Sequence, residues 1–192
     1  MEPLRGNRNF QLKLIRNCPI LLPPLIKLGS SYHPSDSWGT IDTRYAKHRL
    51  PQLKKQQLTT LKGWRGERVN AQAVVWTGTE VKDLNFSFTD FKDKKGNSLS
   101  DEAFKAGFIR YVMTDELNKD GRGACGHRQA VDYDSLLVAD PIDTNLKSMS
   151  VPARTVQPIW VQCWIPQSAT PGTYKGALLV KDGSRLCSSL PL

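Results

Sequence analysis

The sequence predicts an all-β protein, an antiparallel two-sheet β-sandwich of immunoglobulin-like or jelly-roll-like type that follows a poorly ordered N-terminal arm. From Leu58 onward, short segments alternate apolar and polar residues, as strands with one buried face do. Glycine, proline, asparagine and aspartate separate these segments at regular intervals. Because no segment has the 3.6-residue period of an amphipathic helix, we expect no helix longer than about three turns between Leu58 and Gly183.

The first clear strand lies in WRGERVNAQAVVWTG, from Trp64 to Gly78, which glycine bounds on both sides. Its apolar positions are Val69, Ala71, Ala73 and Val75, and they alternate with Arg68, Asn70, Gln72 and Val74. This period of two predicts a strand with one buried face and one largely polar face.

Weaker signals fill the middle of the chain. We expect a short strand near Thr40–Tyr45, and QLKKQQLTTL fits either one helical turn or an extended connection. DLNFSFTDF and FIRYVMTDEL alternate and predict strands, with a polar turn around Gly96 between them. SLLVADPID predicts a strand that ends at Pro141. The expected core contains Val69, Ala71, Phe86, Phe88, Tyr111, Ile159, Val161 and Leu178.

The last strands are the clearest. PIWVQCWIP, from Pro158 to Pro166, predicts a strand in which Ile159, Val161, Cys163 and Ile165 alternate with Trp160, Gln162 and Trp164 on the opposite face. The chain then turns at Pro171–Gly172, where we expect a type II turn with a positive φ at Gly172. Tyr174 should point inward with its hydroxyl on a backbone partner, as in a tyrosine corner. Gly176 should allow a close approach of another segment.

Positive charge concentrates near the N-terminus. The formal net charge is +9, but residues 1–57 contain only Glu2, Asp36 and Asp42 as acids, whereas both signs are interspersed afterwards. We therefore predict a poorly ordered basic leader over residues 1–35 and a β-sandwich domain over residues 36–192. Because the excess charge lies in the leader, we expect no nucleic-acid partner.

Motifs for cofactors are missing from the sequence, so we expect no cofactor and no metal. The four cysteines show no disulfide framework, and Cys125 with His127 would supply two ligands where zinc needs three or four. No segment is long enough to span a membrane. The apolar stretch CPILLPPLIKL is a poor export signal because it contains three prolines and a lysine, so the localisation stays open.

Six segments in one order resemble the N-terminal β-sandwich domain of glycoside hydrolase family 123, which comprises β-N-acetylgalactosaminidase-like bacterial proteins. They are WRGERVNAQAVVWT, FIRYVMTDEL, CGHR, SLLVADPID, VQPIWVQCWIP and PGTYKGALLV. The resemblance covers Tyr32 to Gly183, and the block W-x-G-E-R-x-N-A-Q is its most specific part. It implies a periplasmic or cell-envelope setting and a following (β/α)₈ barrel that carries out hydrolysis.

We expect the catalytic barrel to be absent, with the sandwich truncated at its C-terminal end, because the sequence stops where the next strand should begin. In the family, the substrate's own N-acetyl group attacks while an adjacent Asp-Glu pair assists. This chain has such a pair, Asp115-Glu116, but the resemblance places it in the sandwich. We therefore expect no catalytic residue here.

Candidate carbohydrate or domain-interface residues form three groups. The first is the aromatic strand face, and the second is the polar start of the Trp64–Gly78 strand. The third contains TDEL and CGHR. The candidates are Trp160, Trp164, Gln162, Arg65, Glu67, Arg68, Gln72, Asp115, Glu116, His127 and Arg128. Burial against the sandwich or the missing barrel is the favoured interpretation, and direct contact with sugar is the alternative.

The function predicted from the sequence is that of an accessory sandwich domain of a family 123-like glycoside hydrolase. Alone, this domain would be non-catalytic, and it would pack against or support the missing glycosidase barrel. The alternative is a carbohydrate-binding module for glycans with N-acetylhexosamine. The expected partner is therefore the missing barrel or a glycan.

Overall fold

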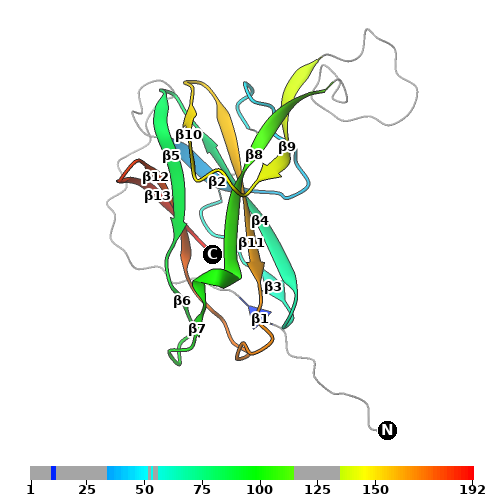
Figure 1. The fold of residues 1–192 in the computed structure, drawn as a ribbon, viewed down its shortest axis with the longest axis vertical. Helices are drawn as coiled ribbons and strands as arrows, with labels where there is room; N and C mark the ends of the chain where they lie inside the picture. The colour runs from blue at the N-terminus through cyan, green and yellow to red at the C-terminus, as the bar shows by residue number, and fades with distance from the viewer. Residues whose placement is uncertain (1–9, 12–33, 52, 54–55, 115–134) are drawn as a thin grey trace, which may run out of the picture.

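A computed structural model describes residues 10–11, 34–51, 53, 56–114 and 135–192, and two antiparallel sheets dominate it (Figure 1). The five-stranded sheet has the order β2 (Ser35–Gly39), β4 (Arg68–Trp76), β11 (Val156–Trp164), β8 (Phe104–Thr114) and β9 (Leu136–Asp143). The four-stranded sheet has the order β10 (Ser148–Val151), β5 (Val81–Phe88), β12 (Ala177–Asp182) and β13 (Arg185–Pro191). The predicted sandwich is confirmed.

Short elements complete the described part of the chain. β1 (Phe10–Gln11) pairs with β3 (Lys62–Gly63), and β6 (Phe91–Lys92) pairs with β7 (Ser98–Leu99). A single 3₁₀ turn, η1 (Asp101–Ala103), precedes β8, and no α-helix occurs within the described ranges. Residues 56–61 belong to no helix, turn or strand, so this part of QLKKQQLTTL is an irregular connection and not a helical turn.

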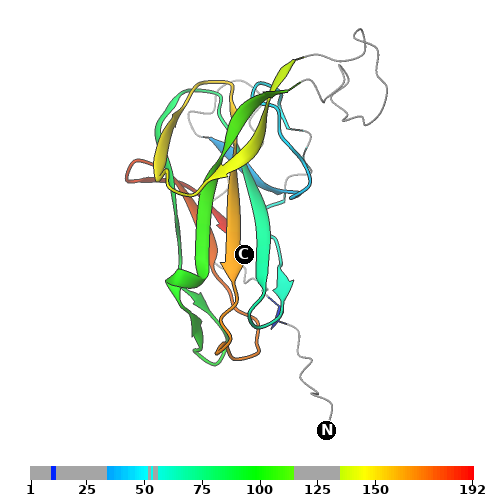
Figure 2. The same cartoon turned by 45° about the vertical axis from the view of Figure 1, so that its right-hand side comes forward.

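The centre of the larger sheet follows the sequence pattern closely. In Figure 2, β11 runs between β8 and β4, and its register with β4 is unbroken from Val156↔Trp76 to Trp164↔Arg68. Ile159, Val161 and Cys163 have no exposed surface. Each fully buried aliphatic side chain of this kind stabilises the fold by about 1.5–3 kcal/mol.

Aromatic rings fill one end of the core between the sheets. Phe91 and Phe104 stack with their ring centroids 3.8 Å apart, and Phe88 lies against both. Gly176 passes beside this cluster, where a Cβ atom would lie 2.6 Å from the Phe91 ring. The predicted close approach at Gly176 is therefore present, and Phe91 is the neighbour that requires it.

The predicted core is correct in most positions. Val69, Ala71, Ile159, Val161 and Leu178 are buried, and Phe86 and Phe88 are partly buried against the core. Tyr111 lies outside this cluster, because the core-facing residues of β8 are Phe104, Ala106 and Phe108. The Tyr111 hydroxyl instead donates a hydrogen bond to the Val156 carbonyl.

Strand boundaries differ from the prediction at two places. The expected strand near Thr40–Tyr45 is replaced by β2, which ends at Gly39 and is followed by a turn. β9 does not stop at Pro141 but continues to Asp143. Proline is tolerated there because β9 is the last strand of the sheet and Pro141 lies where its pairing with β8 shifts register.

The turn before β12 confirms one prediction and corrects another. Tyr174 is 2% exposed, and its hydroxyl donates a hydrogen bond of 2.7 Å to the Thr170 carbonyl, as expected for a tyrosine corner. Gly172 does not take a positive φ, so the expected type II turn is wrong. Among the described glycines, Gly66, Gly96 and Gly183 have a positive φ.

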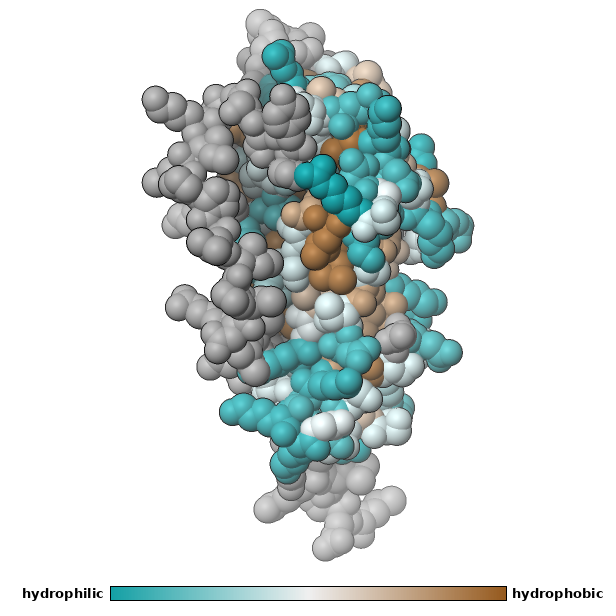
Figure 3. Space-filling model, turned by 90° about the vertical axis from the view of Figure 1, so that its left-hand side faces the viewer, coloured by the Kyte–Doolittle hydropathy of each residue, from teal (hydrophilic) through white to brown (hydrophobic). Residues whose placement is uncertain are grey.

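On the side of the molecule that carries β5, β12 and β13, hydrophilic residues are mixed with exposed hydrophobic ones, which include a patch near the middle of the view (Figure 3). In the register of these strands, Ser87 and Ser189 flank Leu179, and Asn85 lies beside Lys181. These positions alternate with the buried Leu178 and Val180, so they face outward.

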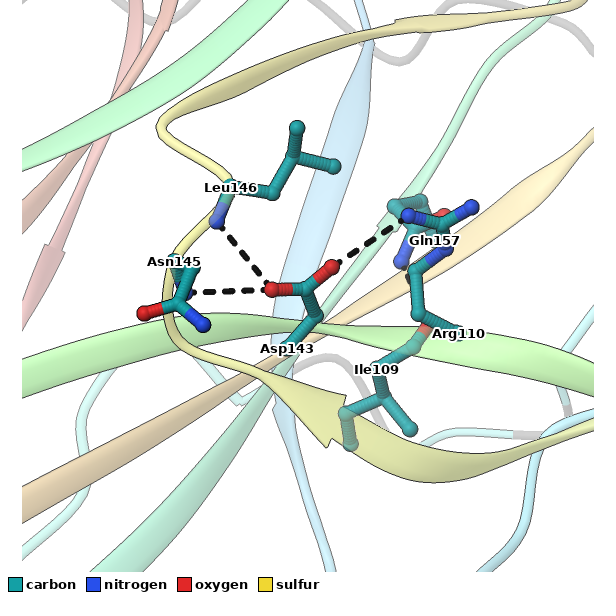
Figure 4. A network of polar contacts seen from close by, with 6 residues as sticks. All are labelled: Ile109, Arg110, Asp143, Asn145, Leu146 and Gln157. Carbon is teal, nitrogen blue, oxygen red and sulfur yellow. Dashed lines mark hydrogen bonds and ion pairs between the residues drawn. The ribbon is translucent and has the colours of Figure 1, made fainter.

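The ladder between β8 and β9 contains a bulge next to Ile109, where two β9 residues, Asp140 and Pro141, lie opposite Arg110 of β8. The buried amide of Gln157 donates a hydrogen bond of 2.9 Å to the Ile109 carbonyl at this point (Figure 4). Nearby, the Asp143 carboxylate accepts hydrogen bonds from the backbone N–H groups of Asn145 and Leu146 and pairs with Arg110 at 3.3 Å. The bulge is thus held from a neighbouring strand and from the following turn.

Candidate functional site

The outer face of the five-stranded sheet carries the aromatic strand face predicted from the sequence. Gln162 lies opposite Asn70, and Trp164 lies opposite Arg68. Exposure rises along β11, since Trp160 is partly buried whereas Trp164 is 54% exposed. We call this surface the tryptophan face, and it consists of Arg68, Asn70, Trp160, Gln162 and Trp164.

Arg68 and Trp164 interact directly. The guanidinium carbon of Arg68 lies 4.7 Å from the centroid of the Trp164 ring, which is a cation–π distance. Beside them, the Gln162 amide donates a long hydrogen bond of 3.4 Å to the Asn70 side-chain oxygen. The Arg68 contact covers one side of the indole and restricts its rotamer, although the ring stays exposed.

Gln72 lies on the same face of β4 but has a different environment. It is 2% exposed, and its amide nitrogen donates to the carbonyl oxygens of Thr40 and Thr43 at 2.8 and 3.0 Å. These two hydrogen bonds fix the turn that follows β2 against the sheet. Gln72 is therefore placed to hold the backbone and is not open to a ligand.

The polar residues before β4 form a tight turn from Trp64 to Glu67. The Glu67 carboxylate accepts a hydrogen bond of 2.7 Å from the Trp64 N–H, and Gly66 has a φ of +81°. The Gly66 N–H and the Glu67 carbonyl each bond to the backbone of Ile165. Arg65 and the 45% exposed Trp64 project from this turn toward solvent.

A groove of about 540 Å³ opens next to Trp164, between the segment from β7 to η1 and the loop from β11 to β12. We call it the Trp164 groove. Its polar lining comes from both segments, and Leu99, Ala103 and Ala169 supply buried apolar surface. The polar lining consists of Asn97, Ser98, Ser100, Glu102, Gln167, Ser168 and Thr170.

Part of the groove is held by internal hydrogen bonds. The Asn97 amide donates to the Asp93 carboxylate at 2.7 Å, and this bond is the main cause that lowers the pKa of Asp93. Tyr174, which also lines the groove, has its hydroxyl on Thr170. Burial is the main cause that raises the pKa of Tyr174. Asp93 thus stays ionised and Tyr174 neutral around neutral pH.

The structure brings together only some of the candidate carbohydrate or domain-interface residues that the sequence predicts. Trp164 and Arg68 lie side by side with Gln162, whereas Gln72 is buried farther along the strand. Asp115, Glu116, His127 and Arg128 lie outside the described residues. The groove itself was not predicted from the sequence. The local sequence feature that marks it is the polar stretch PQSAT just after Trp164.

One solved structure of a known family shares this architecture. A structure titled as a family 123 glycoside hydrolase from Clostridium perfringens, described as hydrolysing glycolipid glycans, is similar over 83% of this chain at 20% identity and a TM-score of 0.61. This chain spans 26% of that structure's length. A second structure, AvmM, described as catalysing macrocyclization in alchivemycin A biosynthesis, matches 67% of this chain and 81% of its own at 12% identity and a TM-score of 0.32.

No curated protein matches the sequence. In the described part of the chain, no helix is both long and apolar enough for a membrane crossing. The model of the glycoside hydrolase 123 N-terminal domain matches residues 38–182, which include the tryptophan face and most of the sandwich. The chain therefore belongs to the family of glycoside hydrolase 123 N-terminal domains.

Proposed function

We propose that this chain acts as a non-catalytic accessory sandwich that packs against or supports the catalytic barrel of a glycoside hydrolase. The observation that carries the proposal is the family match over residues 38–182, which is to an N-terminal domain. The 26% coverage of the Clostridium perfringens structure supports it, because a domain of this size would be one part of a larger enzyme.

The chemistry of the described groove agrees with this role. Hydrolysis of a glycosidic bond ordinarily needs an acid and a second carboxylate or an assisting group that converge on the scissile bond. Among the described residues that line the groove, Glu102 is the carboxylate, and it is exposed. Asp93, which binds Asn97 of the lining, accepts hydrogen bonds that lower its pKa and make it a poor acid.

An activity assay tests the non-catalytic role. The purified chain, incubated at high concentration with a chromogenic β-N-acetylgalactosaminide, should release no more chromophore than buffer does. Turnover that Glu116→Gln abolishes would contradict the proposal and would make Asp115-Glu116 the site. A Glu102→Gln variant, assayed in parallel, separates an activity of the groove from one of that pair.

A second candidate function is carbohydrate binding, and the exposure of Trp164 favours it. Trp164 is 54% exposed beside a groove with polar lining, and an exposed aromatic ring next to polar groups offers a surface that a ligand can cover. Binding of the fluorescently labelled chain to a glycan array tests this function directly. A complete absence of binding on the array would leave the packing role alone.

A further inference from the structure

The Trp164 groove joins an exposed indole ring to a wall of uncharged polar groups. We propose that this groove binds a neutral saccharide, with one pyranose ring stacked on Trp164 and its hydroxyl groups on the two loops. The proposal rests on the carbohydrate-binding function above and assigns that function to particular residues.

Trp164 would supply the platform for the sugar ring. The face of an indole carries negative charge density, and the C–H groups on one side of a pyranose carry weak positive charge, so the two surfaces attract each other. Arg68 lies 4.7 Å from the ring centroid and covers one side of the indole, so another part of the ring borders the groove. Because this contact already restricts the ring, less side-chain entropy is lost when a ligand binds.

The β11–β12 loop offers hydrogen-bonding groups beside this platform. Gln167 and Ser168 are both exposed, and in the described part of the chain no hydrogen bond or ion pair occupies either side chain. An amide and a hydroxyl each donate and accept, which suits a sugar hydroxyl that does the same. The Gln167 amide lies over Gly66, at the place where a Cβ atom of that residue would be, so the turn from Trp64 to Glu67 supports its position.

The opposite wall sets the preference for an uncharged ligand. Ser98 and Ser100 contribute hydroxyl groups, and Glu102 contributes the negative charge among the described lining residues. No lysine or arginine belongs to that lining. A carboxylate or sulfate placed at this wall would therefore meet repulsion from Glu102, whereas the Arg68 guanidinium lies against Trp164 and outside the lining. The Glu102 carboxylate can instead accept hydrogen bonds from sugar hydroxyl groups.

The dimensions of the groove are compatible with such a ligand. A volume of about 540 Å³ falls within the range of about 300–1,000 Å³ that small-molecule sites occupy. The buried Leu99, Ala103 and Ala169 give the groove an apolar surface, which can contact the apolar side of a sugar ring.

A glycan array with matched pairs of probes tests the proposal. Each pair consists of a neutral oligosaccharide of hexose and N-acetylhexosamine, and the same oligosaccharide capped with sialic acid or sulfate. We expect binding to neutral members and clearly weaker binding to their acidic counterparts. Titration of the best neutral probe should then show that Trp164→Ala weakens binding about tenfold or more, which corresponds to the loss of about 1.4 kcal/mol.

Trp64→Ala is the matched control, because the exposed Trp64 ring does not line the groove and the substitution keeps the Trp64 backbone N–H that bonds to Glu67 in the turn under Gln167. It should bind the probe as the wild type does, and Gln167→Ala should bind several-fold more weakly. Circular dichroism melts would establish that each variant is folded. If Trp164→Ala retains full binding, the assignment to the Trp164 groove is wrong, although the carbohydrate-binding function remains supported. If no array member binds, both the function and the assignment are wrong. A preference for acidic members would contradict the proposal that the ligand is neutral.

Discussion

On the four-stranded sheet, the outward positions along β5, β12 and β13 include Asn85, Ser87, Lys181 and Ser189, and their apolar residues are the aliphatic Leu179 and the 50% exposed Leu186. On the five-stranded sheet, the equivalent outward positions of β11 hold Trp160, Gln162 and Trp164. Both sheets bury their inner faces in one core, so burial of the core does not explain the difference.

The comparison indicates which outer face has a task beyond solvation. A face that only meets water needs no large side chain, and small polar residues satisfy it. The other face carries two tryptophans, one of them 54% exposed. Their apolar surface remains in contact with water, which the stability of the sandwich does not require. The same face also carries a buried polar residue, Gln72, that anchors the chain after β2.

The largest expected difference between the faces concerns Gln72. Replacement by leucine removes both amide hydrogen bonds and leaves the carbonyl groups of Thr40 and Thr43 without that donor. We expect Gln72→Leu to lower the free energy of unfolding by about 2–4 kcal/mol, measured by urea denaturation. Ser87→Ala on the other sheet should change it by less than about 0.5 kcal/mol. If Gln72→Leu and Ser87→Ala unfold at the same urea concentration, the expected difference between the two faces is wrong.

The inner face of the larger sheet should give stability a dependence on alkaline pH. Burial raises the pKa of the Cys163 thiol to about 12, so the folded state favours the neutral thiol. The stabilisation is complete below the pKa of the unfolded chain, near 8.5–9, and is lost as pH rises toward the folded value. At pH 10 the loss should be about 1.5–2 kcal/mol.

Cys163→Ala provides the comparison for this prediction. Unfolding by urea at pH 8 and pH 10 should show a steeper loss of stability in the wild type than in the variant. A Cys187→Ala variant is the control from the other sheet, since Cys187 is only partly buried and should affect the profile less. Parallel profiles for the wild type and Cys163→Ala would show that this thiol is not responsible.

The smallest expected effect is the coupling between Arg68 and Trp164. A double-mutant cycle with Arg68→Met and Trp164→Ala should give a coupling free energy of about 0.5–1 kcal/mol, because the contact is exposed to solvent. The same cycle with Ser87→Ala and Ser189→Ala should give a value near zero. A coupling near zero at Arg68 and Trp164 would mean that the cation–π contact does not hold the ring in solution.

The sequence predicted the parts of the fold that depend on local alternation. β4 and β11 keep an unbroken period of two, and their buried residues agree with that pattern. β8 departs from it because both Phe108 and Ile109 are buried at the bulge that Gln157 supports from another strand. A long-range hydrogen bond of this kind leaves no local signal.

The candidate site was predictable only in part for the same reason. Trp160, Gln162 and Trp164 share one strand, so their common face follows from spacing alone. The Trp164 groove requires two loops that are distant in sequence, and alternation does not reveal which loops meet. Gly172 illustrates a related limit, because the Pro-Gly pair allows a type II turn but the surrounding contacts selected another backbone conformation.

Both edges of the five-stranded sheet are closed by the chain that follows β2. Tyr45 and Lys47 exchange backbone hydrogen bonds with β9, and the Gln56 carbonyl accepts from the Trp38 N–H on β2. An open edge strand can recruit a strand from another molecule, which leads to aggregation. This short connecting segment therefore protects solubility, and proteolytic nicking within it should cause the domain to self-associate through its sheet edges before the core is lost.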